Sequence, residues 1–142
     1  MLARSFMVSA DNAHAVHPNH PEYADPVNAP VLGGGVVLKF NAMQRYTTDG
    51  VSAAVFRKIC GKAQVPLQTY CNRADIPGGS TLGHISLTHV SVPTVDVGLA
   101  QLAMHSCYET AAAADVQYLE QAMTAYYSAT LEATPDGGYR IS

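Results

Sequence analysis

A run of residues that break helices and strands constrains the fold of this chain more than any other feature. Four prolines, at positions 18, 21, 26 and 30, are followed by three consecutive glycines at 33–35. Proline lacks an amide hydrogen and fixes φ, so neither a helix nor a central strand tolerates this density. We therefore expect a long irregular loop, and loops of this length are usually functional or lie at an interface.

Strands and helices are expected to alternate around this loop. Residues 5–10 precede it and 36–40 follow it, and both read as short apolar strands. Val51, Val55 and Ile59 recur at helical spacing after Asp49, a suitable N-cap, which predicts a helix over roughly residues 50–62.

The remaining elements continue the same alternation. We expect a strand at 66–70, a helix at about 81–90 capped by Ser80, a strand at 94–99 and a helix at about 109–131. This order predicts an α/β fold with a largely parallel sheet. The whole chain, 1–142, is expected to form one domain, with residues 132–142 as a flexible tail.

Composition excludes several classes of protein. Hydrophobic residues make up 48% of the 142 residues and charged residues only 13%, which excludes disorder and predicts apolar surface covered by another domain or subunit. The net charge is −3 and the eight basic residues are scattered, so we expect no nucleic-acid partner. No apolar run reaches the length of a membrane span, and no secretory signal is visible, so a cytoplasmic location is expected. The three cysteines lack CxxC spacing and are expected to be reduced.

One carboxylate and one imidazole stand at similar positions, each after an expected strand. Asp11 directly follows the first expected strand, and His105 follows the 94–99 strand after a short loop. Carboxylate oxygens and neutral imidazole nitrogens both suit zinc, and loops at the carboxyl ends of strands converge on one crevice. On spacing alone, Asp11 would be read as a turn or cap residue and His105 as an ordinary core histidine.

Four segments change this interpretation. They are Ser-Ala-Asp-Asn-Ala-His-Ala-Val-His-Pro-Asn at 9–19, Gly-Ser-Thr-Leu-Gly at 79–83, Thr-Val-Asp-Val-Gly at 94–98 and Ala-Met-His-Ser at 103–106. In this order they resemble the late part of the M18 family of zinc metallopeptidases, the aspartyl aminopeptidases, over roughly residues 4–130. The resemblance implies the C-terminal portion of a three-layer αβα zinc-peptidase sheet.

The resemblance also implies a set of metal ligands. Asp11 would bind one zinc ion and His105 the other, with manganese or cobalt as substitutes. The bridging carboxylate and the glutamate that acts as general base would lie upstream, in sequence that this chain does not contain. His84 and Tyr108 stand where the family usually has proline and arginine, which affects packing rather than the proposed ligands.

Lys39 and Tyr46 are candidate substrate-binding residues. Lys39 is a lone charge in the apolar segment 35–40, where a charge is costly unless it is exposed or paired. An exposed lysine on an edge strand is the alternative. In the family that the chain resembles, lysine and tyrosine at these positions line the pocket for an acidic side chain.

His14, His17 and His20 recur at every third residue. Pro18 and Pro21 prevent the helix that would bring them together, so a separate three-histidine zinc site is not expected. His14 and His17 remain candidates for orienting the metal ligands.

These expectations combine into one function and one alternative. The chain would be the C-terminal segment of a two-zinc metalloaminopeptidase that removes N-terminal Asp or Glu, inactive without the missing part. Its partners would be a peptide substrate, the remainder of the catalytic domain and further copies in a homo-oligomer. The alternative is a non-catalytic remnant that acts as a metal-binding or assembly module.

Overall fold

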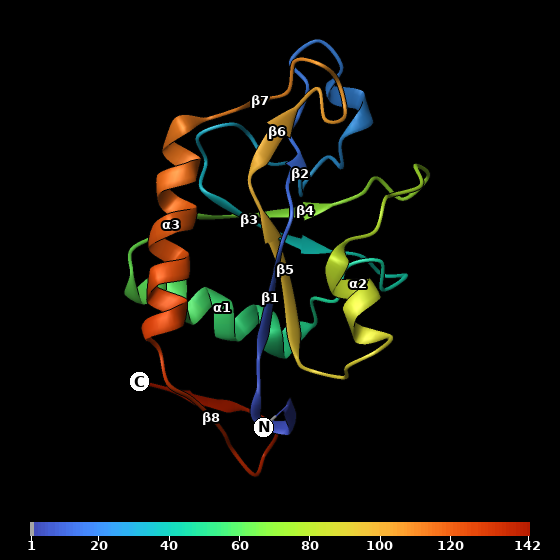
Figure 1. Ribbon diagram of the computed structural model, residues 1–142. Helices are drawn as coiled ribbons and strands as arrows, with labels where there is room; N and C mark the ends of the chain where they lie inside the picture. Colours follow the sequence, from blue (N-terminus) through green and yellow to red (C-terminus); the bar gives the residue numbers. More distant parts are fainter. Residues whose placement is uncertain (1) are drawn as a thin grey trace.

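The computed structural model describes residues 2–142, and Figure 1 shows its course. In chain order the elements are η1 (Leu2–Arg4), β1 (Met7–Ala10), β2 (Ala13–His14), η2 (Pro21–Tyr23), β3 (Val36–Phe40), α1 (Gly50–Lys62), β4 (Leu67–Cys71), α2 (Leu82–Leu87), β5 (Thr94–Gly98), β6 (Ala100–Leu102), β7 (Thr110–Ala111), α3 (Ala113–Ser128), β8 (Leu131–Ala133) and β9 (Tyr139–Ile141). None of the helices within residues 2–142 is both long enough and apolar enough to cross a bilayer.

The main sheet has four strands in the order β1-β5-β3-β4. β1 runs parallel to β5, and β3 runs parallel to β4. The two central strands, β5 and β3, are antiparallel, with Leu38 opposite Val97. The sheet is therefore mixed, and the expectation of a largely parallel sheet holds within each pair but not at the centre.

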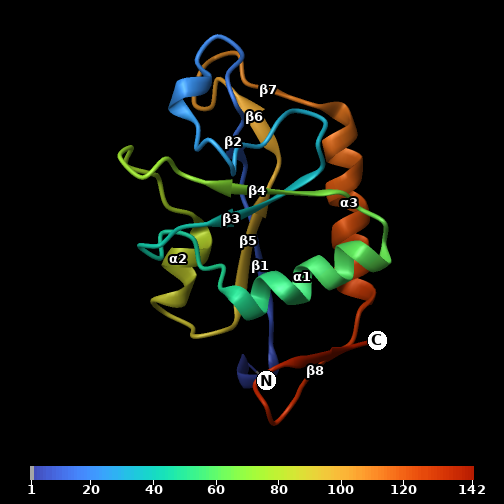
Figure 2. The ribbon, with the colours of Figure 1, turned by 180° about the vertical axis from the view of Figure 1, so that it is seen from behind.

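Helices cover both faces of this sheet, which confirms the predicted α/β class. α1 and α3 pack on one face, where Val36, Leu38 and Val97 meet Phe56 in the main core. α2 contacts β1 and β5. Figures 1 and 2, seen from opposite sides, show α1 and α2 on different sides of the main sheet.

The helix α1 begins and ends where the sequence predicts. Its N-cap is Asp49, whose side chain accepts a hydrogen bond from the Ser52 amide while the Ser52 hydroxyl accepts one from the Asp49 amide. The other two helices are shorter than expected. α2 has Thr81 rather than Ser80 as its N-cap, and α3 begins at Ala113 because residues 110–111 pair with β6 instead.

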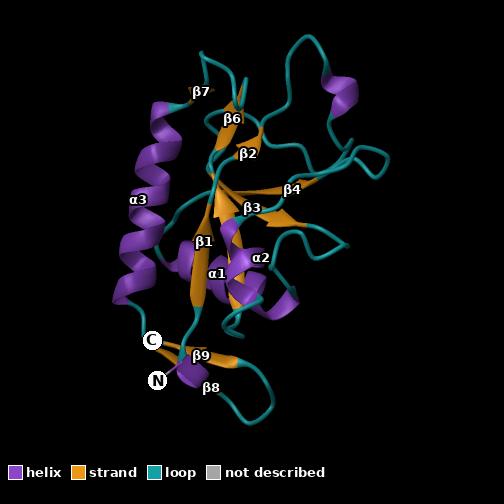
Figure 3. Cartoon of the chain, turned by 45° about the vertical axis from the view of Figure 1, so that its right-hand side comes forward, coloured by secondary structure: helices purple, strands orange, loops and turns teal. Residues whose placement is uncertain are grey.

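A second sheet, β2-β6-β7, extends the first pair of strands (Figure 3). β2 and β6 are parallel, with Ala13 opposite Ala100, just as β1 and β5 are parallel below them. The rest of the predicted irregular segment is confirmed as loop, with the short 3-10 turn η2 as its only other regular element within residues 15–35. This topology carries residues after β1 and after β5 toward the same end of the molecule.

Residues 131–141 differ from the expected unstructured tail, because β8 and β9 form an antiparallel hairpin. The Tyr139 ring packs edge-on against Phe6, with ring centroids 5.9 Å apart, and the Lys62 ammonium donates to the Ile141 carbonyl at 2.9 Å. These contacts come from parts of the chain distant in sequence, so the local pattern of Pro135, Gly137 and Gly138 gave no sign of the hairpin. The flexibility of the hairpin stays a prediction.

Candidate metal and substrate site

Asp11 lies between β1 and β2, where its backbone is held tightly. Its amide donates to the Val97 carbonyl at 2.9 Å, and the Ala13 amide donates to the Leu99 carbonyl at 2.8 Å. A Cβ atom at Gly98 would lie 1.9 Å from the Asp11 carbonyl oxygen, so only glycine allows this approach. The Asp11 side chain is 55% exposed, which leaves a carboxylate on a rigid backbone facing solvent.

His105 lies in the turn that follows β6. Its φ is 70°, and its amide donates to the Glu109 carboxylate at 2.6 Å, which fixes the turn. The parallel pairing of β2 with β6 brings this turn close to His14, whose pKa is lowered first by burial and then by the charges of His105 and Lys39. His14 therefore lies near both His105 and Lys39, and the Lys39 ammonium in turn lies 3.9 Å from the Asp11 carboxylate.

Lys39 is buried directly beneath the segment Asp11–Asn12, with only 2% of its surface exposed. Its ammonium donates to the carbonyls of Asn12 at 3.0 Å and Asp11 at 3.3 Å, and lies 3.9 Å from the Asp11 carboxylate. Burial lowers the pKa of Lys39, while the charges of Asp11 and Asp96 act in the opposite direction. The alternative of an exposed, solvated lysine is therefore wrong.

Tyr46 covers Lys39, with the ammonium 4.6 Å from the centre of its ring. Tyr46 is itself 5% exposed and packs against Tyr70, with ring centroids 6.2 Å apart. Burial raises the pKa of both phenols. The two predicted substrate residues thus lie together beside Asp11, although both are deeper than a surface pocket would require.

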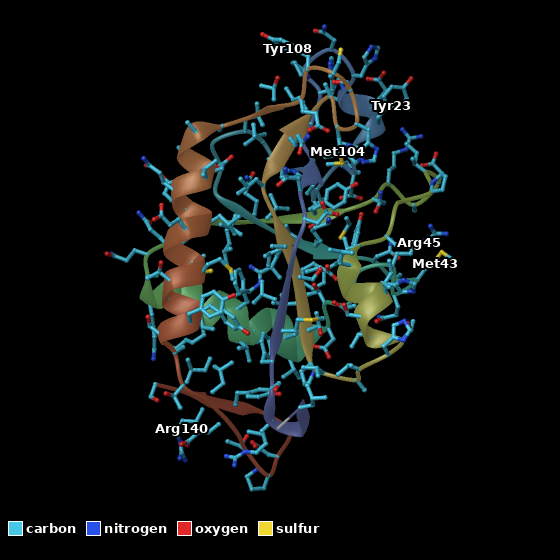
Figure 4. All side chains as sticks on the ribbon, viewed as in Figure 1. Tyr23, Met43, Arg45, Met104, Tyr108 and Arg140 are labelled. Atoms are coloured by element: carbon cyan, nitrogen blue, oxygen red, sulfur yellow. The ribbon has the colours of Figure 1, made fainter. Side chains whose placement is uncertain are left out.

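Two cavities flank these residues. One, of about 560 Å³, is lined by His14, His17, His20 and Met104, and the His17 and His20 rings lie 5.5 Å apart. The other, of about 860 Å³, is lined by Met43 and Arg45, whose guanidinium donates to the Gly78 carbonyl at 2.8 Å. Tyr23 also lines the first cavity, and Figure 4 shows Met104 and Tyr23 toward the upper end of the molecule and Met43 and Arg45 on the far side of α2.

The donors present suit zinc but do not complete a site. Within residues 2–142, no group of three or more His, Cys, Asp or Glu side chains could hold a metal ion. Asp11 and His105 offer the carboxylate and imidazole that zinc accepts, and further ligands would have to come from elsewhere.

Sequence reasoning missed two buried carboxylates that shape the loops. Asp96, in β5, accepts hydrogen bonds from Thr47 and Thr81, and Asp115, in α3, accepts from the amides of Gly33 and Gly35. Both are 0% exposed. The signal that could have revealed Asp96 is a lone charge inside the apolar strand 94–99, the same signal that singled out Lys39.

Comparisons with known proteins agree on one family. Residues 1–127 match the family model described as aminopeptidase I zinc metalloprotease (M18). A probable M18 family aminopeptidase 2 from Clostridium acetobutylicum is 46% identical over 127 residues, which are 89% of this chain and 29% of that protein.

Solved structures give the same answer. In the cryo-EM structure of the Ape4 and Nbr1 complex, one chain matches with a TM-score of 0.86 and 39% identity, over 87% of this chain and 24% of that one. The S. cerevisiae mApe1 dodecamer matches with a TM-score of 0.78 and 25% identity, over 89% of this chain and 27% of that one. This chain therefore spans less than a third of the length of these relatives.

Proposed function

The chain belongs to the M18 family of zinc metallopeptidases, and we propose from this that it forms the part of a metalloaminopeptidase that contributes Asp11 and His105 to a two-zinc site. The observation that supports the proposal is the parallel pairing of β1 with β5 and of β2 with β6, because Asp11 follows β1 and His105 follows β6, each beyond the carboxyl end of a strand that runs in the same direction. Each would bind a different zinc ion.

The chemistry divides between the metal and the chain. Bound zinc would polarise the scissile carbonyl and lower the pKa of a bound water to about 7. The chain's own contribution is to hold its two ligands: the hydrogen bond to the Val97 carbonyl and the close approach at Gly98 fix Asp11, while the Glu109 carboxylate fixes the turn of His105. His14, with its lowered pKa, stays neutral beside them and is suited to orient a ligand or substrate by hydrogen bonding.

We assign substrate preference to Lys39 and Tyr46. The Lys39 ammonium gives positive potential to a small volume next to the Asp11 carboxylate, and the Tyr46 hydroxyl supplies a donor. Together they favour a peptide whose N-terminal side chain is Asp or Glu. His17 lines the adjacent cavity and would contact the substrate or orient its neighbours.

The partners and the assembly of the complete protein are inferred from its family. The remainder of the catalytic domain would supply the other ligands and the general base, so we expect little or no hydrolysis by the isolated chain. Because a relative assembles as a dodecamer, we propose a homo-oligomer for the complete enzyme. A cytoplasmic location stays a prediction. We do not favour the non-catalytic remnant.

A chimera tests the assignment of the ligands. Residues 1–127 would replace the matching segment of the Clostridium acetobutylicum relative, and hydrolysis of aspartyl, glutamyl and leucyl p-nitroanilides would be measured with zinc. We expect Asp11→Asn and His105→Gln each to lower kcat/KM by at least about a hundredfold, with a parallel loss of bound zinc. His89→Gln, at an exposed position outside the site, is the control. Full zinc content in both ligand variants would contradict the proposal.

The same chimera tests substrate preference. Lys39→Met should lower kcat/KM for the aspartyl and glutamyl amides and leave the leucyl amide nearly unchanged, because only the acidic side chains use the ammonium. Arg45→Met removes a nearby cation whose guanidinium is bonded to Gly78, and should not change the ratio. An equal loss for all three amides in Lys39→Met would show that Lys39 serves the fold rather than selection.

A further inference from the structure

The Asp96 carboxylate is fully buried in the middle of β5. Its neighbours Val95 and Val97 point into the core beneath α1, so Asp96 points to the opposite face of the sheet. One carboxylate oxygen, Oδ2, accepts hydrogen bonds from the Thr47 amide at 2.5 Å and the Thr47 hydroxyl at 2.7 Å. The other, Oδ1, accepts one from the Thr81 hydroxyl at 2.7 Å. A buried carboxylate is costly unless it is satisfied in this way.

The first oxygen holds the segment that carries Tyr46. Thr47 is the next residue in the chain, and Thr48 is also tied to β5, because its hydroxyl accepts from the Asp96 amide at 2.8 Å. Three consecutive residues, 46–48, are therefore buried against the sheet. Their attachment determines where the Tyr46 ring lies over the Lys39 ammonium.

The second oxygen holds the loop that precedes α2. Thr81 is the N-cap of this short helix but makes no capping bond within it, since its hydroxyl is committed to Asp96. Two residues later, the Gly83 amide donates to the Ser9 hydroxyl at 3.0 Å. A Cβ atom at Gly83 would lie 2.9 Å from the Ser9 oxygen and 3.0 Å from Asp96 Oδ1. The loop and the first turn of α2 are therefore held against β5 and β1. The contact with β1 is at Ser9, which precedes Asp11 by two residues.

We propose that Asp96 is a positioning residue of the substrate site, which fixes Tyr46 through Thr47 and the loop 79–83 through Thr81. Removal of the Thr47 attachment would free the segment that carries Tyr46 over Lys39, and removal of the Thr81 attachment would free the residues before α2, which are tied to Ser9, two residues before Asp11. The link to substrate rests on the proposed function. The placement of Tyr46 does not, because it can be measured in the 142-residue chain without metal or substrate.

The first measurement is ¹⁹F NMR of the full chain labelled with 3-fluorotyrosine. Tyr46→Phe assigns the Tyr46 resonance among the eight tyrosines, and Tyr139, in the C-terminal hairpin, serves as an internal reference. The matched pair of variants is Asp96→Ala and Asp115→Ala, since both remove a fully buried carboxylate that accepts bonds from a loop. We expect Asp96→Ala to shift or broaden the Tyr46 resonance and Asp115→Ala to leave it in place. Equal changes in both variants would reduce the role of Asp96 to general stability and overturn the proposal.

Milder variants keep the test decisive if Asp96→Ala does not fold. Thr47→Val removes one donor to Oδ2 and should shift the Tyr46 resonance. Thr81→Val should speed amide exchange in residues 80–84 by at least about tenfold, because a hydrogen bond to a charged group is lost, and Thr81→Ser should restore protection. Unchanged exchange in Thr81→Val, or an unmoved resonance in Thr47→Val, would refute the corresponding attachment.

The chimera described above connects placement to substrate. Asp96→Asn keeps the shape of the side chain but replaces two charged acceptor oxygens by one neutral acceptor and an NH2 group, so both attachments weaken and we expect a higher KM for the aspartyl amide with a smaller change in kcat. Asp115→Asn should change neither. A fall in kcat alone would overturn the link to substrate binding. An inactive parent chimera would instead reject the proposed function and leave the ¹⁹F result standing.

Discussion

At the scale of single residues, the site depends on contacts with main-chain atoms as much as on its functional side chains. The sequence pointed to Asp11 and Lys39 through a motif and a lone charge, and the structure brings them within 3.9 Å. The sequence could not reveal that the Lys39 ammonium donates hydrogen bonds to the carbonyls of Asp11 and Asn12, because such bonds form only where two strands meet in space. The role of Gly98 was invisible for the same reason.

Gly98 should therefore be intolerant of any side chain. Gly98→Ala would place a Cβ 1.9 Å from the Asp11 carbonyl, and displacement of this segment should cost at least about 2 kcal/mol of unfolding free energy. Gly61→Ala is the matched control, because nothing lies within 4 Å of the added atom in α1 and helical alanine should stabilise by about 0.5–1 kcal/mol. Urea unfolding followed by circular dichroism measures both. A Gly98→Ala protein as stable as the parent would contradict the close approach.

Cys60 should make stability depend on alkaline pH. Burial raises the pKa of its thiol from 9.0 to about 12, so the folded state favours the protonated form. The resulting stabilisation is complete below pH 9 and is lost as the pH rises toward 12, by up to about 1.4 kcal/mol per pH unit.

Two cysteine variants separate the effect of this thiol from that of other titrating groups, because the slope of unfolding free energy against pH can be compared between them. Cys60→Ala should flatten the fall in unfolding free energy measured from pH 8 to about pH 11, while Cys107→Ala, at an exposed position, should not. The buried tyrosines 46 and 70 contribute a remaining slope in both variants. Parallel curves for the parent and Cys60→Ala would count against a strongly shifted thiol.

At the scale of elements, local signals were predictable and long-range ones were not. α1 was placed correctly because its cap and its apolar spacing are both written in adjacent residues. The start of α3 was misplaced because residues 110–111 pair with β6, a contact outside the helix. The antiparallel contact between β3 and β5 was missed because an apolar strand pattern does not encode strand direction.

The caps of α1 and α3 give a reciprocal prediction. Asp49→Ala removes the capping box of α1 and should cost about 1 kcal/mol of unfolding free energy, most of which Asp49→Ser should restore. The N-cap of α3 is Ala112, which has no side chain that can cap the helix, so Ala112→Ser should stabilise by about 0.5–1 kcal/mol. Chemical denaturation measures all three. If Asp49→Ala and Ala112→Ser changed the unfolding free energy in the same direction, capping would not limit the stability of these helices.

At the scale of the whole molecule, the hairpin β8–β9 closes the end of the fold where β1 begins. It lies beyond the residues that match the family, 1–127, yet it covers Phe6 at the start of the first strand. Tyr126 joins the same group, since its hydroxyl donates to the Phe6 carbonyl at 2.5 Å and its ring lies 6.3 Å from the Phe6 ring. The hairpin therefore connects α3 to the strand that leads to Asp11.

This arrangement predicts that the hairpin stabilises the fold. Tyr139→Ala removes an edge-on aromatic contact together with its buried area, and should cost about 1–3 kcal/mol of unfolding free energy. Tyr108→Ala, at a ring that is 83% exposed, should cost less than about 0.5 kcal/mol and is the matched control. Amide exchange of β1 distinguishes a local from a global effect, because loss of the Phe6 contact should speed exchange first at residues 7–10. A Tyr139→Ala protein with parental stability and unchanged exchange in β1 would mean that the hairpin is only an appendage, which would return residues 132–142 to the flexible tail that their composition suggests.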